Sequence, residues 1–303
     1  MTAQPMHTVA DDAFATPFGW QDSGLEPLPW FPFTVAASRG HTDAAGRIAQ
    51  RAERAYWCLR RLFGFTPRFR LLALAPGDWS RFATLPAYGS THFTADGHLV
   101  VGTEPAAAWH DVSRFLASRL PQATLRNLVR IHGRDRAHPD GPDLSGVADT
   151  LIAHELAHVI ADQAGATFPR RWLAEAFADY ALVTVLAETD LAGLQRVGTL
   201  AEAALLLGDR APSGGALDHP DGALDPVSSV LAHLALTRGV MAAYAHARSR
   251  PLARWFALAR VDRKHEPDAD HEFGRMLARD VHPELGRLAA RCAQWYGAEA
   301  KAA

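Results

Sequence analysis

The amino-acid sequence predicts an α+β fold in which a short mixed region is followed by a longer helical one. The chain has 303 residues, of which 48% are hydrophobic and 21% are charged, as is usual for a globular protein with a sizeable core. Strand signals lie before the polar loop 133–143, and almost every later segment has helical spacing. We therefore expect an extended arm over 1–29, an α+β lobe over 30–143 and a helical lobe over 144–303.

The expected α+β lobe contains strands, helices and one hairpin. The strands are predicted at 31–38 and 68–75, and the helices at 42–63 and about 106–120. Gly64 marks the end of the first helix, because glycine favours the left-handed conformation that terminates helices. Alternating residues over 90–104, centred on an Asp-Gly pair, predict a β-hairpin, since this pair favours the tight turns that join antiparallel strands.

The expected helical lobe follows directly. Apolar residues recur at helical spacing, which predicts helices at 144–164, 169–188, 190–207, 226–247, 251–261, 268–280 and 283–296. Between two of these helices, residues 208–225 form a long loop rich in glycine, proline and aspartate. Such long loops commonly serve a function, and a lid over a neighbouring cleft is one hypothesis.

Charge and motif content exclude several classes of function. The formal charge of −2 gives no basis for binding a nucleic acid or a membrane surface, because these polyanions do not attract a nearly neutral protein. No stretch approaches the roughly 18 apolar residues of a membrane span, and the first residues lack the pattern of a secretory signal. We therefore expect a cytoplasmic protein. Neither a phosphate-binding P-loop nor a G-x-S-x-G nucleophile elbow occurs.

The segment TLIAHELAHVIADQ, residues 150–163, places two histidines and an adjacent glutamate among mainly apolar residues. On a helix His154 and His158 are four residues apart and share a face, so both imidazoles can bind one ion. Glu155 lies about 100° around the helix, close enough to accept a proton from water without binding the ion. This is the H-E-x-x-H pattern of zinc enzymes. The alternative is a partly buried helix with two hydrogen-bonded histidines.

The next predicted helix supplies a candidate third ligand. A catalytic zinc site needs three protein ligands and keeps its fourth position open. Glu175 and Asp179 lie four residues apart in an apolar segment, so Glu175 can bind the ion while Asp179 accepts the free ring N–H of a ligand histidine. The alternative for Glu175 is an exposed face near Arg170 or Arg171.

HELAH at 154–158 and WLAEAFADY at 172–180 resemble the paired motifs of the gluzincin metallopeptidases, the zinc proteases of thermolysin and aminopeptidase type. The resemblance implies a zincin-like fold, an active-site cleft between the two lobes, one zinc ion and a peptide or protein substrate that pairs with the edge strand of the 90–104 hairpin. By matching position it implies zinc ligands His154, His158 and Glu175, with Glu155 as general base and Asp179 supporting a ligand. The interval 159–174 is slightly shorter than is usual, which indicates a compact, divergent member.

Members of this family use a tyrosine or histidine to stabilise the oxyanion that develops during hydrolysis. Small members often carry a tyrosine early in the helix expected at 226–247, where this chain has an Asp-Pro pair. His233 is the first candidate to replace it, although a lone histidine on an apolar helix also fits a hydrogen-bonded core residue. Tyr180 and Tyr244 are the other candidates, with core packing and a surface edge as their respective alternatives.

The sequence therefore predicts a zinc-dependent peptidase that hydrolyses peptide bonds by metal-activated water with Glu155 as general base. A second hypothesis is a zinc-binding but catalytically inactive scaffold that serves as a binding or interaction domain, because the tyrosine is missing and the ligand interval is short. A third hypothesis is a helical protein without a metal.

Overall fold

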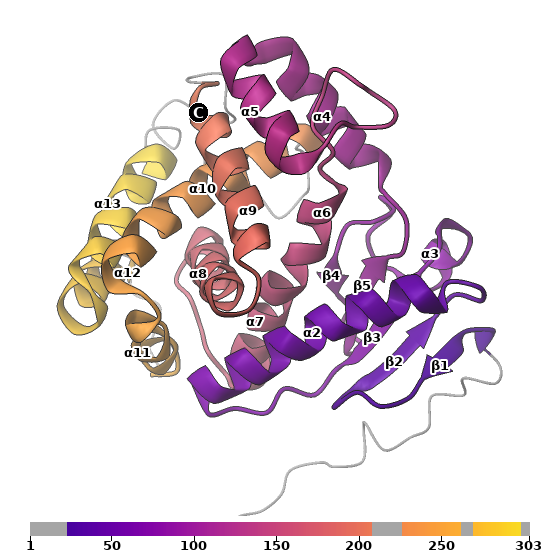
Figure 1. Ribbon diagram of the computed structural model, residues 1–303. Coiled ribbons are helices and arrows are strands. Elements are labelled where there is room, and N and C mark those ends of the chain that lie inside the picture. The colour runs from indigo at the N-terminus through magenta and orange to yellow at the C-terminus, as the bar shows by residue number, and fades with distance from the viewer. Residues whose placement is uncertain (1–22, 208–225, 262–268, 298–303) are drawn as a thin grey trace, which may run out of the picture.

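The computed structural model describes residues 23–207, 226–261 and 269–297, and these form an α+β fold (Figure 1). The strands are β1 (Glu26–Leu28), β2 (Thr34–Ala37), β3 (Arg70–Leu74), β4 (His92–Phe93) and β5 (His98–Gly102). The helices are α2 (Thr42–Phe63), α3 (Pro76–Phe82), α4 (Ala107–Arg119), α5 (Gln122–His132), α6 (Ser145–Ala148), α7 (Ile152–Gln163), α8 (Arg171–Thr189), α9 (Leu191–Leu205), α10 (Pro226–Ala247), α11 (Arg250–Ala259), α12 (Ala269–Met276) and α13 (Pro283–Gly297). A 3₁₀ turn (Asp149–Leu151) precedes α7, and a π-helical turn (Leu277–Val281) follows α12.

The five strands form one mixed sheet in the order β1-β2-β3-β5-β4. β3 is parallel to β2 and β5, whereas β1 and β4 are antiparallel strands at the two edges. Successive side chains point to opposite faces. Leu71 and Leu99 join the main core on the side of α2, while Leu72 and Val100 pack with Trp79 of α3 on the other side.

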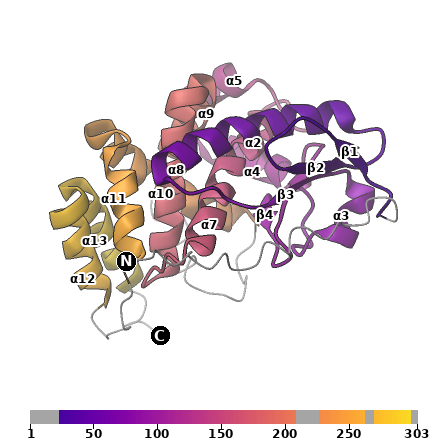
Figure 2. The same ribbon diagram turned by 90° about the horizontal axis from the view of Figure 1, so that it is seen from below.

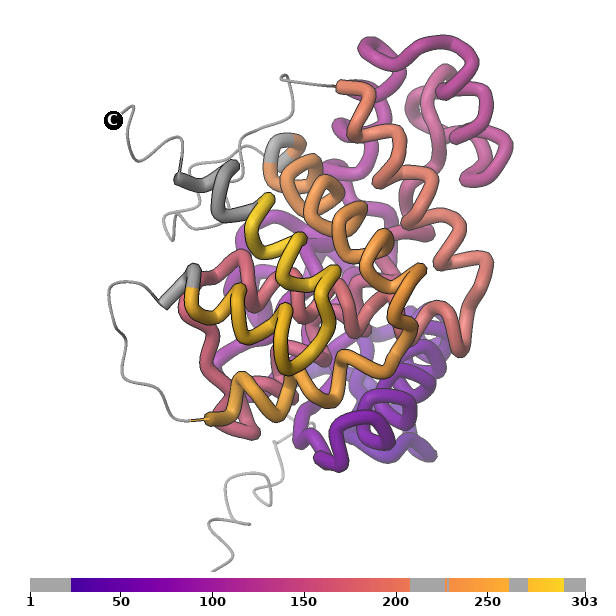
Figure 3. The backbone as a smooth tube through the Cα atoms, turned by 90° about the vertical axis from the view of Figure 1, so that its left-hand side faces the viewer, coloured from indigo at the N-terminus to yellow at the C-terminus, as the bar shows by residue number. Residues whose placement is uncertain are grey.

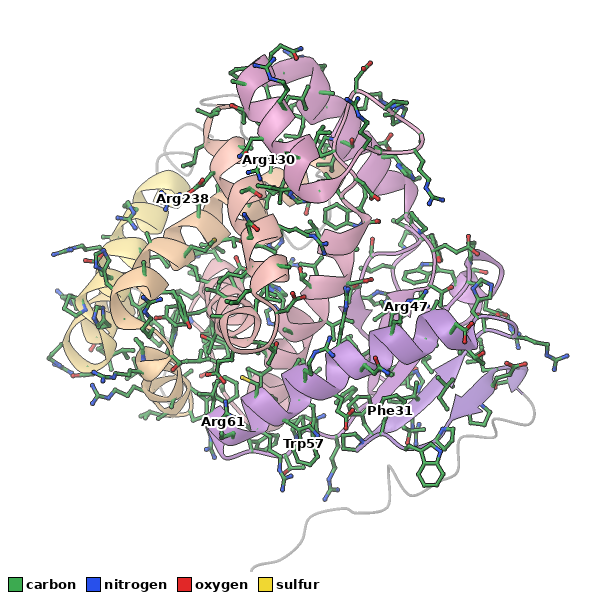
Figure 4. All side chains as sticks on the ribbon, viewed as in Figure 1. Phe31, Arg47, Trp57, Arg61, Arg130 and Arg238 are labelled. Atoms are coloured by element: carbon green, nitrogen blue, oxygen red, sulfur yellow. The ribbon has the colours of Figure 1, made fainter. Side chains whose placement is uncertain are left out.

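α2 crosses the sheet and links it to the helical part of the chain. The helix ends at Gly64, whose φ of 62° is left-handed and whose N–H donates to the Arg60 carbonyl. Arg47, Trp57 and Arg61 lie along α2 (Figure 4), and the guanidinium of Arg61 pairs with Glu188 of α8. The apolar face of α2 packs toward the sheet, α7 and α8.

α8 is the central helix of the molecule. Most of its side chains are buried, and they lie on all faces of the helix, as expected of a helix surrounded by other elements. α7, α9 and α10 pack against it, and α11, α12 and α13 lie on the side of the molecule away from the sheet (Figures 1 and 2). Figure 3, viewed from that side, shows α13 next to α10, and α12 packs against α13.

One cluster of buried apolar residues extends through both parts of the chain. It runs from Val35 and Leu71 in the sheet, through Leu156 of α7 and Phe177 of α8, to Leu288 of α13. The α+β and helical parts therefore share a core. Within the described ranges, no helix combines the length and apolar character needed to cross a membrane.

The predicted elements occur in the predicted order, with several differences. Residues 26–28 were expected in an arm but form β1, an edge strand that tolerates Pro27 because one side of it is unpaired. α3 and α5 were not predicted, although Pro76 suits the first turn of α3. The expected helix 268–280 is α12 followed by the π-helical turn.

A further difference lies just before the histidines. The expected helix 144–164 is divided into α6, the 3₁₀ turn and α7. Within the turn, the Thr150 hydroxyl donates to the Val147 carbonyl and Asp149 pairs with Arg51 of α2 at 2.6 Å. Such side-chain bonds compete with regular helix geometry. Residues 1–22 and the loop 208–225 lie outside the described residues, so the lid hypothesis is not addressed by the structure.

Candidate metal centre

α7 places the two histidines of the H-E-x-x-H segment side by side. His154 and His158 are one helical turn apart, and their ring centroids are 4.7 Å apart. The two Nε2 atoms lie 3.0 Å from each other. His154 is buried, whereas 27% of the His158 side chain is exposed, so the pair lies at the edge of the core.

α8 brings Glu175 to the same point. Its Oε2 atom is 3.1 Å from His154 Nε2 and 3.3 Å from His158 Nε2, and the three ligand atoms lie within 4.8 Å of one another. Ligand atoms about 2.0–2.1 Å from a tetrahedral zinc ion are separated by about 3.3 Å. The three distances of 3.0 to 3.3 Å are close to that value. The group therefore fits a zinc ion in both donor type and spacing.

Hydrogen bonds to neighbouring residues also fix the orientation of Glu175 and His154. Arg171 Nε donates to Glu175 Oε1 at 3.3 Å, which leaves Oε2 to face the histidines. Asp179 Oδ1 lies 2.9 Å from His154 Nδ1. Because an ionised carboxylate can only accept, Nδ1 carries the proton in this bond, and Asp179 fixes the orientation of the ring.

This arrangement favours positive charge, either a second proton or a metal ion, between the three ligand atoms. With the His154 proton on Nδ1, the neutral ring would turn a lone pair on Nε2 toward a carboxylate oxygen of Glu175, which repels it. A second proton or a metal ion removes the repulsion. Burial by itself lowers the pKa of His154, but the hydrogen bonds to Asp179 and Glu175 raise it well above its ordinary value.

The same balance acts on Glu175. Burial by itself raises the pKa of this carboxyl, yet the hydrogen bonds with His154 and His158 hold it well below its usual range. Glu175 is therefore ionised and ready to bind a cation. Because protons and a metal ion compete for the same ligand atoms, metal affinity is expected to fall as pH decreases.

Glu155 borders a cavity beside the metal-ligand group. Burial raises the pKa of its carboxyl, and the neighbouring charges of His154 and His158 oppose that rise. The cavity, of about 300 Å³, is lined by His154, Glu155, Asp179 and His233 among its polar residues. His158 and Glu175 are not part of its lining, so the cavity meets the ligand group along His154.

Of the three predicted oxyanion candidates, the structure brings only His233 to this site. His233 Nδ1 is 4.0 Å from Glu175 Oε2, and its ring centroid is 6.0 Å from that of His154. Although 33% of its side chain is exposed, desolvation by the surrounding protein lowers its pKa and favours the neutral ring. A neutral imidazole can still donate one hydrogen bond.

The structure does not bring Tyr180 and Tyr244 to this site, and neither lines the cavity. The Tyr180 hydroxyl donates to the Arg248 carbonyl at 2.6 Å, and its ring is 5.8 Å from that of Tyr244. Tyr180 follows Asp179 and therefore points about 100° away from it around α8. Tyr244 shares a helix face with His233 but lies about 16 Å further along α10.

Sequence reasoning named His233 but missed that it belongs to a row of polar residues on α10. Ser229, His233 and Thr237 occur at intervals of four, and all three line the cavity. The Thr237 hydroxyl lies 2.8 Å from Asp179 Oδ2. The repeated interval within an apolar helix is a signal that was available from the sequence.

Comparison with models of protein families, with curated proteins and with solved structures gives no significant match. The properties of this site are therefore argued from its own residues.

Proposed function

We propose that the protein is a zinc-dependent peptidase whose active site has the zincin-like arrangement implied by its motifs. The observation that carries the proposal is the meeting of His154 Nε2, His158 Nε2 and Glu175 Oε2 within 4.8 Å, next to Glu155. Two imidazoles and one carboxylate, with an open fourth position, are the donor set of catalytic rather than structural zinc sites.

Each residue then has a distinct role. His154, His158 and Glu175 would hold the zinc ion, which when bound supplies a Lewis acid and makes water more acidic. Glu155 accepts the proton of the attacking water and returns it to the leaving amine, and a raised pKa suits this exchange at neutral pH. His233, at the wall of the same cavity, is the candidate donor to the developing oxyanion.

The surroundings of the cavity favour an extended peptide as substrate. β4 is an edge strand, and residues 88–91, which precede it, form part of the cavity wall. The unpaired side of an edge strand can bind a peptide backbone as an additional strand. Trp109, Leu151 and Leu182 give the cavity an apolar wall that would accommodate an apolar substrate side chain.

The test compares Glu155→Gln with the wild-type protein. We expect both to bind one zinc ion per chain, measured by elemental analysis, because Glu155 is not a ligand. Cleavage of a peptide library, followed by mass spectrometry, should fall by about 10²- to 10⁴-fold in the variant. Glu202→Gln, at an exposed position of α9, is the matched control and should cleave normally.

Two results would contradict the proposal. If the wild-type protein binds no zinc, the proposed metal centre is refuted. If the Glu155→Gln variant is as active as wild type, Glu155 is not the general base. The distance of Tyr180 and Tyr244 from the site favours one second candidate, a zinc-binding domain without peptidase activity. Stoichiometric zinc without Glu155-dependent cleavage would support that candidate.

A further inference from the structure

We propose that Thr237 of α10 is a positioning residue that raises the zinc affinity of the centre by holding Asp179. This inference rests on the proposed zinc site and adds a residue that neither motif contains. Thr237 Oγ1 lies 2.8 Å from Asp179 Oδ2, and Asp179 Oδ1 lies 2.9 Å from His154 Nδ1. A chain of two hydrogen bonds thus connects α10 through α8 to a ligand on α7.

Because the residues are buried, losing either of these two hydrogen bonds is costly. Asp179 is 2% exposed and Thr237 is 4% exposed, so both side chains are largely shielded from bulk water. His154 and Thr237 are the hydrogen-bond partners of Asp179 among the described residues. A buried carboxylate oxygen left without a donor is costly, and an unheld carboxylate can rotate about its bond to Cβ. Thr237 therefore fixes the plane in which Asp179 accepts the His154 proton.

The hydroxyl of Thr237 has two acceptors within reach but only one proton. It lies 2.8 Å from the His233 carbonyl as well as 2.8 Å from Asp179 Oδ2. The carbonyl is that of the residue four positions earlier in α10, and helix geometry already provides it with a backbone N–H. A charged carboxylate is the stronger acceptor, so the proton is expected to lie toward Asp179.

The consequence for the metal centre follows from the His154 tautomer. A firmly held Asp179 keeps the proton on Nδ1 and the lone pair of Nε2 directed at the ligand group. Losing a residue that orients a metal ligand typically weakens binding by about 10- to 100-fold. Since Thr237 acts through Asp179, we expect an effect at the lower end of that range.

The experiment measures zinc affinity of the full chain by competition with a chromophoric chelator, together with the visible spectrum of the cobalt-substituted protein. Thr237→Val keeps the shape of the side chain and removes the donor, and should weaken zinc binding about tenfold and change the cobalt spectrum. Thr237→Ser restores the hydroxyl and should be close to wild type. Thr184→Val is the matched control, since Thr184 is fully buried on α8 and its hydroxyl donates to the Tyr180 carbonyl.

A second comparison separates positioning from a general packing defect. In an Asp179→Ala background, Thr237→Val should cause no further loss of zinc affinity, because the residue through which it acts is gone. Thr237→Ala serves in place of the valine variant if the latter fails to fold, as judged by circular dichroism of the metal-free proteins.

The outcomes distinguish this inference from the proposed function. Wild-type protein without zinc affinity would overturn the metal centre and the inference together. Wild-type affinity retained in Thr237→Val, or an equal loss in the presence and absence of Asp179, would overturn the role of Thr237 alone.

Discussion

At the scale of single residues, Glu175 contributes the one negative charge among the three ligand atoms. Its Oε2 faces both imidazoles, and its Oε1 accepts from Arg171. Glu175→Gln removes that charge and should weaken zinc binding by at least about 100-fold. Substitution of residues that only support a ligand already weakens metal affinity by about 10- to 100-fold. Titration of the apoprotein with zinc measures this change. An unaltered dissociation constant would show that Glu175 is not a ligand.

Cys58 offers a residue-scale prediction away from the metal. Burial, reinforced by the nearby Glu188 carboxylate, raises the pKa of this thiol to about 12. At pH 8 the native thiol is therefore protonated, and alkylation by iodoacetamide should be at least about 100-fold slower than in the unfolded chain, where the pKa is about 8.5. The measurement uses a Cys292→Ser background so that only Cys58 reacts. Equal rates in the native and unfolded protein would contradict it.

The raised pKa of Cys58 also makes the free energy of unfolding depend on pH. The pKa of Cys58 is higher in the folded than in the unfolded state, so its contribution to the free energy of unfolding is complete below about pH 8.5. It declines as pH rises toward 12, because the unfolded thiol ionises first. Cys58→Ala should reduce the loss of stability over this alkaline range.

At the scale of elements, Gly89 fixes the segment that leads into the edge strand. Its φ of +77° is left-handed, and a Cβ there would lie 2.5 Å from the Ala106 Cβ. Gly89→Ala should destabilise the protein by about 2–4 kcal/mol, the sum of left-handed strain and steric overlap. Urea denaturation measures the change.

Gly64 is the matched control for that substitution. It also has a left-handed φ, of +62°, but a Cβ there would meet no described atom within 4 Å. Gly64→Ala should therefore cost only the conformational strain, about 1–2 kcal/mol. Equal losses at the two positions would show that the contact with Ala106 does not constrain the loop.

The elements that depend on local pattern were predictable, and those that depend on distant partners were not. α10 has the predicted bounds, and α2 ends at the predicted Gly64, because helical spacing and a terminating glycine are local signals. The division of the expected helix 144–164 was not predictable, since it involves Asp149 and Arg51, which are far apart in sequence.

The residues of the candidate site likewise fall into those that local spacing predicts and those that depend on packing between helices. His154, His158, Glu175 and Asp179 could be predicted because each pair shares one helix face at an interval of four residues. Thr237 could not be assigned its contact, because the contact depends on how α10 packs against α8.

At the scale of the whole molecule, the shared core predicts cooperative unfolding. Buried residues of the sheet, of α8 and of α13 belong to one cluster. Thermal unfolding should therefore give coincident transitions by far-ultraviolet circular dichroism and by tryptophan fluorescence. Two separated transitions would instead indicate that the α+β and helical parts unfold independently.

Metal removal is the second prediction at this scale. A zinc ion at the proposed centre would bind the folded chain in preference to the unfolded one, and a ligand at 1,000 times its dissociation constant stabilises the folded state by about 4 kcal/mol. Treatment with a chelator should lower the melting temperature by several degrees, and added zinc should restore it. The Glu175→Gln variant, which binds zinc more weakly, should respond much less to both treatments.

Placing every ligand atom on α7 and α8 has a consequence for biosynthesis. The ribosome completes the set of ligand side chains at Glu175, whereas Thr237 is added 62 residues later. An ion captured by the nascent chain would at first exchange readily with the cellular metal supply. By the proposed role of Thr237, its retention would increase about tenfold once α10 docks.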